Sequence, residues 1–164
     1  MPTALLDSQT TFAQSTAGTT PGQPAVGLNR KVVLLTSAQI LALFTTPVVL
    51  VPAPGPGFMI IPEFVKFDMQ AGSVAYADGG GGAVSLTEGS LTQALASNGI
   101  FTITALFRGH QSLQMAGTDT AAATPTDENA ALTIAKATAN FTAGNGTALV
   151  TVYYLIEPIA PAPN

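Results

Sequence analysis

Residues 48–67, VVLVPAPGPGFMIIPEFVKF, decide the fold class of this chain. Two runs of β-branched, aliphatic and aromatic side chains flank a Pro- and Gly-rich corner at residues 52–57, and only Glu63 and Lys66 are charged. Such runs favour strands, and proline and glycine favour a tight turn between them. Pro62 cannot donate a hydrogen bond to a sheet ladder, so we expect an edge strand or a β-bulge there.

The same pattern recurs on both sides of this stretch. Further strand candidates are residues 32–35, 101–107, 132–136 and 150–156, and residues 137–142 are interpreted as the end of a strand. Thr36 and Ser37 can cap a short helix that reaches Phe44, because a hydroxyl group accepts from the free N–H groups of the first turn. About seven or eight strands with one or two short helices predict an all-β fold, an antiparallel β-sandwich or jelly roll.

Four consecutive glycines at residues 79–82 are the most conspicuous loop signal. A phosphate-binding loop would need a lysine at fixed spacing and a following helix, and neither is present. We interpret these glycines as a mobile hairpin loop.

The chain of 164 residues is long enough for one domain. Residues 1–29 show neither a helical nor a strand period and predict an extended N-terminal arm, followed by a β domain at residues 30–164. Leu5, Leu6 and Phe12 are the few large apolar side chains of the arm. Two interpretations remain open: a flexible terminus, or an arm that docks these side chains on a neighbouring subunit.

Charge is scarce in this sequence. Charged residues make up 9% of the chain, whereas soluble domains carry about 25%. Charge therefore gives little protection against association, and we expect the protein to work packed against other subunits. The five Lys and Arg residues form no stripe, which disfavours binding to nucleic acid. The chain has no cysteine, so a disulfide framework and a thiolate site are both excluded.

The sequence also lacks a targeting signal. The first residues have neither the basic start nor the apolar stretch of a signal peptide, and no run of about 20 apolar residues could span a membrane. We expect a soluble protein that is not exported by the usual route and has no membrane partner.

Candidate catalytic and metal-binding residues are few. His110 is the single histidine, and we interpret it as a surface loop residue because no acid or nucleophile motif accompanies it. A sandwich could bring Glu63 or Asp68 close to another carboxylate, although no motif supports this. Residues 119–129 lack the ligand spacing of a calcium loop and are interpreted as a solvent-facing loop. We therefore predict no enzymatic activity, no cofactor and no metal.

At residues 36–69, TSAQILALFTTPVVLVPAPGPGFMIIPEFVKFDM, the chain resembles small virion proteins of tailed bacteriophages. In that pattern a proline- and glycine-rich corner leads into a long apolar strand, a later Tyr-Ala pair precedes a Gly-rich segment, and the terminal strand carries paired aromatics. The matching residues are Thr36, Ile40, Leu41, Leu43, Pro47, Val48, Leu50, Val51, Pro52, Ala53, Pro54, Gly55, Gly57, Tyr76, Ala77, Tyr153 and Tyr154. The similarity covers residues 32–157 and leaves out the polar arm.

The resemblance implies a non-enzymatic structural protein of the particle, of the capsid decoration or cement type, made in the host cytoplasm and located on the capsid surface of the virion. The implied partners are the major capsid protein and further copies of the chain, with a homotrimer expected because a shell presents three-fold sites. The alternative is a tail or head-fibre binding module that recognises a host-surface glycan. The absence of tryptophan disfavours that alternative, because sugar faces stack on exposed aromatic rings.

Overall fold

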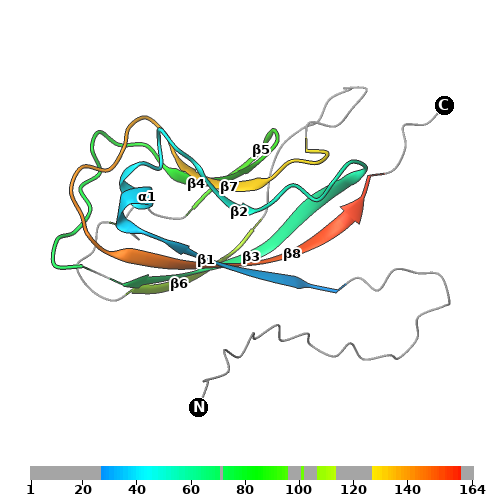
Figure 1. The fold of residues 1–164 in the computed structure, drawn as a ribbon, viewed down its shortest axis with the longest axis horizontal. Coiled ribbons are helices and arrows are strands. Elements are labelled where there is room, and N and C mark those ends of the chain that lie inside the picture. Colours follow the sequence, from blue (N-terminus) through cyan, green and yellow to red (C-terminus); the bar gives the residue numbers. More distant parts are fainter. Residues whose placement is uncertain (1–26, 71, 96–100, 102–106, 114–126, 160–164) are drawn as a thin grey trace, which may run out of the picture.

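The computed structural model describes residues 27–70, 72–95, 101, 107–113 and 127–159, which form two four-stranded sheets packed as two layers (Figure 1). Sheet A has the strand order β1-β8-β3-β6 and sheet B the order β2-β7-β4-β5. The elements are β1 (Asn29–Leu35), α1 (Ser37–Leu41), β2 (Val48–Val51), β3 (Phe58–Gln70), β4 (Val84–Glu88), β5 (Leu91–Ala94), β6 (Phe107–Ser112), β7 (Leu132–Lys136) and β8 (Thr147–Pro158). The prediction of an all-β sandwich is confirmed.

All strand pairs are antiparallel and the pairing is nested. The first strand, β1, pairs with the last, β8, and β2 pairs with β7. Inside these, β3 pairs with β6 and β4 with β5. Most of these partners are far apart in the sequence, so the fold depends on long-range pairing rather than on local hairpins.

The core lies between the two sheets because successive side chains of a strand point to opposite faces. In β4 and β7 the inward positions hold Val84, Leu86, Leu132 and Ile134, all fully buried. A cluster of four aromatic rings fills one part of this core. Between ring centroids, Tyr76 lies 5.8 Å from Phe141 and 6.5 Å from Phe101. Phe101 in turn lies 5.6 Å from Phe141 and 6.5 Å from Phe67. The Tyr76 hydroxyl donates to the Gly146 carbonyl at 2.6 Å, so the buried polar group is satisfied.

The chain passes from sheet A to sheet B through the predicted helix, α1 (Figure 1). Thr36 forms a capping box with Gln39: the Thr36 hydroxyl oxygen accepts from the Gln39 N–H at 3.3 Å, and Gln39 Oε1 accepts from the Thr36 N–H at 2.9 Å. The helix ends at Leu41, one turn earlier than the predicted end at Phe44. Turn residues and Pro47 then lead into β2.

The proline corner that opens β3 is held by side chains from the segment before β7. Asn129 Oδ1 accepts from the Gly55 N–H at 2.9 Å, and Glu128 Oε1 accepts from the Gly57 N–H at 2.7 Å. The Asn129 N–H donates in turn to the Phe58 carbonyl at 2.8 Å. Gly55 and Gly57 have φ values of 108° and 79°, a region that favours glycine. Both glycines are therefore required by backbone geometry.

Pro62 lies at a β-bulge, which was one of the two structures expected at this residue. The register of β3 on β8 shifts between Pro62 and Phe64, and the carbonyl of the intervening Glu63 accepts from the Leu113 N–H at 2.9 Å. β3 as a whole lies between β8 and β6 in sheet A. At Pro62 it pairs only with β8, because its pairing with β6 begins at Phe64, so the strand is also at an edge locally.

The glycine run at residues 79–82 differs from its prediction. It joins β3 to β4, which lie in different sheets, so it is not a hairpin loop. A Cβ atom on Gly79 would lie 2.0 Å from the Asn140 carbonyl oxygen, and one on Gly82 would lie 2.1 Å from the Ala137 carbonyl oxygen. The loop thus packs tightly on residues 137–142. These residues were expected to end a strand, but β7 ends at Lys136 and they bend beneath the glycine loop instead.

Lys136 binds this glycine loop and stabilises it. Its buried amine donates to the Gly81 carbonyl and forms an ion pair with Asp78 at 3.0 Å. The same amine lies 5.1 Å from the centroid of the Phe141 ring. A lysine can be buried here because its charge has both a carboxylate and a ring face as partners.

Sequence analysis missed β4 and β5, which pair around the turn at Gly89 and Ser90. It also placed a strand at residues 101–107. Phe101 lies buried in a turn, β6 begins at Phe107, and residues 102–106 lie outside the described part of the chain.

Candidate interaction surfaces

The outer face of sheet A is the first candidate surface. In β3, Val65, Phe67 and Met69 are buried between the sheets, so the alternating Phe64, Lys66 and Asp68 point outward. The registers place Tyr153, Thr151 and Leu149 of β8, and Ser112, His110 and Arg108 of β6, beside these three residues. On the far side of β8, Arg30, Val32 and Leu34 of β1 complete the rows.

An aromatic cluster lies on this outer face. The His110 ring stacks on Phe64 at 5.5 Å between centroids, and Tyr153 meets Phe64 edge-on at 5.9 Å. The sequence interpretation of His110 as a loop residue is wrong, because it lies within β6 opposite Lys66. The contacts of His110 with Phe64 suit packing or recognition on a sheet surface.

The charges on the outer face are largely paired with one another. Asp68 binds Lys66 at 2.6 Å and Arg108 at 3.4 Å. Glu63, the other acid considered above, has an exposed side chain beside the bulge. Lys66 and Arg108 are exposed on their side of these pairs, so the pairs contribute little stability. Their effect here is to reduce the free charge on a face that also carries apolar side chains.

The β1 edge of sheet A is apolar and exposed. Leu28 is 57% exposed, Leu34 is 55% exposed and Val32 is 38% exposed. In the described part of the chain β1 pairs only with β8, so one side of its backbone has no strand partner. An unpaired edge with apolar side chains is a template for contact with another chain.

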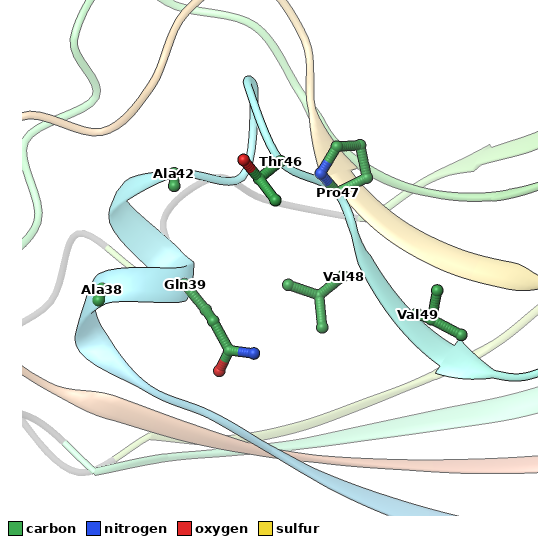
Figure 2. Close-up of a pocket in the computed structure, with 7 residues that line it drawn as sticks. All are labelled: Ala38, Gln39, Ala42, Thr46, Pro47, Val48 and Val49. Atoms are coloured by element: carbon green, nitrogen blue, oxygen red, sulfur yellow. The ribbon is translucent and has the colours of Figure 1, made fainter.

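A second candidate surface is the hollow between α1 and β2 (Figure 2). It has a volume of about 390 Å³ and is lined by Ala38, Gln39, Ala42, Thr46, Pro47, Val48 and Val49. Figure 2 shows Gln39 and Val48 lying between the helix and the strand. Val49 beside them is 50% exposed. Because no charged side chain lines the hollow, it suits an apolar side chain of a partner better than a charged ligand.

The predicted contact residues Leu5, Leu6 and Phe12 lie outside the described residues. The boundary of the arm can nevertheless be compared. Sequence analysis ended the arm at residue 29, and β1 begins at Asn29. The segment predicted to form the arm therefore precedes the exposed edge strand directly in the sequence.

Two buried carboxyl groups were missed by the search for site residues. Glu88 is fully buried at the end of β4, and Asp127 is 8% exposed. Burial raises the pKa of Glu88 to about 7, the hydrogen bond from the Ile60 N–H opposes this rise, and the nearby charge of Asp127 adds to it. A signal existed in the sequence, because alternation places Glu88 on the inward face with Val84 and Leu86. The solvent-facing interpretation of residues 119–129 is wrong at Asp127.

No group of three or more His, Cys, Asp or Glu side chains gathers in the described part of the chain in an arrangement that could hold a metal ion. None of its helices has the length and apolar character needed to cross a membrane.

Comparison of the chain with protein-family models, curated protein sequences and solved structures finds no match.

Proposed function

We propose that the protein works through surface contacts, as a non-enzymatic structural component of an assembly. The observation that carries this proposal is the β1 edge, where exposed apolar side chains accompany an unpaired strand backbone. The adjoining outer face adds Leu149, Phe64 and Tyr153, while most of its charges are paired. Such a surface favours association over chemistry.

The particular assembly that we infer is a bacteriophage particle, whose capsid surface the protein would decorate and cement. The resemblance of residues 36–69 to small virion proteins supports this inference. In the fold, this stretch forms α1, β2, the proline corner and nearly all of β3, all of which are framework elements. The expected partners are the major capsid protein and further copies of the chain, in a homotrimer.

The nested strand pairing supports the jelly-roll form of the sandwich. β1 pairs with β8, β2 with β7, β3 with β6 and β4 with β5. A long antiparallel hairpin gives this order of pairs when it rolls up into two sheets. Such a fold exposes two broad sheet faces and leaves open edges, among them β1. These features suit a protein that must fill a place on a shell.

Copy number in purified particles tests the proposal. We expect quantitative mass spectrometry of particles from the phage that encodes this chain to find hundreds of copies, in fixed ratio to the major capsid protein. A few copies per particle would favour a tail or fibre component. Absence from purified particles would overturn the virion assignment.

The aromatic cluster supports a second candidate function, a tail or head-fibre module that binds a host-surface glycan. Phe64, Tyr153 and His110 offer ring faces and edges on an outward surface, and sugars stack on such rings. Glycan-array binding by the wild-type protein, lost in Tyr153→Ala, would favour this function. A decoration protein would show no such binding.

A further inference from the structure

We propose that Glu88 and Asp127 together bind a divalent cation of the calcium class. The site includes the first residue of the segment, residues 127–129, that holds the proline corner. This assignment is independent of the proposed role in a particle.

Glu88 connects the two sheets. It ends β4 in sheet B, and its Oε1 atom accepts from the Ile60 N–H of β3 in sheet A at 2.8 Å. Its Oε2 atom is buried and has no hydrogen-bond partner. The Ile60 N–H therefore binds one carboxylate oxygen of Glu88, and no described residue donates a hydrogen bond to the other.

Asp127 presents a second unpaired oxygen to the same region. Its side chain is 8% exposed, and its Oδ1 atom is buried without a hydrogen-bond partner. Its backbone carbonyl accepts from the Ala130 N–H at 3.2 Å, which fixes the turn that carries it. Two residues after Asp127, the Asn129 N–H donates to the Phe58 carbonyl at 2.8 Å, and two residues after Phe58 the Ile60 N–H donates to Glu88. The segment of Asp127 and the side chain of Glu88 therefore both bind the start of β3.

The other buried carboxylate oxygens without hydrogen bonds in the described part of the chain have a compensating charge. Asp68 Oδ1 lies 3.4 Å from Arg108 Nε, and Asp78 Oδ1 lies 3.0 Å from the Lys136 amine. No described Lys, Arg or His side chain forms an ion pair with Glu88 or Asp127. A buried charge without a counter-charge is strongly unfavourable, and a bound cation would supply that counter-charge.

The donor atoms select the type of cation. Both side chains offer only oxygen, which suits a hard cation. Zinc prefers nitrogen and sulfur, but the chain has no cysteine and His110 lies on the outer face of sheet A. Calcium tolerates irregular sites and completes its shell with carbonyl groups and water, whereas magnesium requires near-octahedral geometry. Two carboxylates from different segments therefore favour calcium.

A cation here would act on the corner that opens β3. Asp127 is followed directly by Glu128 and Asn129, whose side chains accept from the Gly57 and Gly55 N–H groups. Fixing Asp127 to Glu88 would attach this segment to the end of β4. The expected result is a protein whose resistance to unfolding depends on calcium.

Thermal unfolding of the full-length protein tests this inference. After treatment with a chelator and its removal, the protein is heated at pH 7.5 with increasing CaCl2, with MgCl2, or with NaCl at matched ionic strength. We expect a saturable rise in Tm of about 5 °C when calcium reaches about 100 times its Kd. Magnesium should give a smaller shift at the same concentration. Isothermal titration calorimetry should show one calcium ion per chain.

Three variants show whether any effect belongs to this pair. Glu88→Gln and Asp127→Asn should fold and lose the calcium shift, because each removes one charge from the site. Glu63→Gln removes an exposed carboxylate and should keep the full shift. The inference is overturned if calcium gives no more than the NaCl control, or if its shift persists in both Glu88→Gln and Asp127→Asn.

Discussion

Glu88 occupies a position in β4 that strand alternation assigns to an apolar side chain. Its neighbours on the same face, Val84 and Leu86, are fully buried core residues. Its carboxyl group is tolerated there because the Ile60 N–H donates to it and because burial raises its pKa to about 7. At this single residue, protonation and folding are therefore coupled.

The first prediction follows from the direction of that shift. The unfolded chain releases the Glu88 proton near pH 4.5, while the folded chain retains it up to about pH 7. The stabilising contribution of the protonated side chain is thus complete below pH 4.5 and is lost as pH rises through about 7. Without a bound cation, we expect Glu88→Gln to be more stable than wild type at pH 8, by roughly 3 kcal/mol.

Urea unfolding in a chelator from pH 4 to pH 8 measures this difference. The variant and the wild type should agree at the acidic end and diverge as pH rises. Glu63→Gln is the control, because its side chain is exposed, and it should follow the wild type throughout. A constant difference between Glu88→Gln and wild type over the whole range would contradict the prediction.

At the scale of elements, the proline corner and the segment before β7 form one unit. Gly55 and Gly57 turn the chain, and Asn129 and Glu128 accept from their N–H groups. The corner residues come early in the chain and their acceptors lie more than 70 positions later. The corner is consequently stabilised only when β7 has been placed beside β2 and β4.

The second prediction isolates one of these contacts. Asn129 has a φ of 52°, so Asn129→Gly removes the side-chain acceptor without adding backbone strain. We expect it to lower the free energy of unfolding by about 1 kcal/mol, the usual net value of a hydrogen bond. Asn29→Gly is the control, because its side chain makes only a long, exposed contact with Gly27. Equal urea midpoints for the two variants would show that the corner does not need Asn129.

At the scale of the whole molecule, the two sheets leave an apolar edge at β1, which follows the predicted arm in the sequence. The third prediction concerns this edge. Leu34→Lys places a charge on an exposed position of β1 and should weaken self-association by at least about tenfold, about 1.4 kcal/mol. Sedimentation equilibrium measures the change. Thr92→Lys, at an exposed position of the β5 edge, should leave association unchanged, and an equal loss in both variants would refute a specific role for β1.

The fourth prediction concerns the arm. Leu5, Leu6 and Phe12 would each contribute about 1.5–3 kcal/mol if buried on a partner, whereas ordering the backbone costs about 1–2 kcal/mol per residue. Docking therefore needs main-chain hydrogen bonds to a neighbouring sheet edge as well. Deleting residues 1–26 should leave the sandwich folded, by circular dichroism and thermal unfolding, and should weaken its retention on particles or in its oligomer.

Two results would contradict this prediction in different ways. If the truncated chain unfolds, the arm belongs to the core of its own domain. If the truncated chain binds as tightly as the full chain, the arm is a flexible terminus without a docking role.

The sequence by itself determined the fold class and many of the strands. Local composition was sufficient for β2, β3, β7 and β8, because β-branched runs bounded by proline and glycine are local signals. The cap at Thr36 and the bulge at Pro62 were also predictable, since a capping hydroxyl and a missing N–H act within a few residues.

Only the tertiary structure decided which segments meet. β4 and β5 were missed because their short Ser- and Thr-containing runs become strands through pairing with β7 and with each other. The interpretations of His110 and Asp127 were wrong, and the burial of Lys136 was not predicted. The environment of each of these side chains comes from residues distant in the sequence. Pairing of β1 with β8 and enclosure of Glu88 both require the whole sandwich. Local propensity carries no information on such contacts, and burial, which sets their energies, exists only after the two sheets have packed.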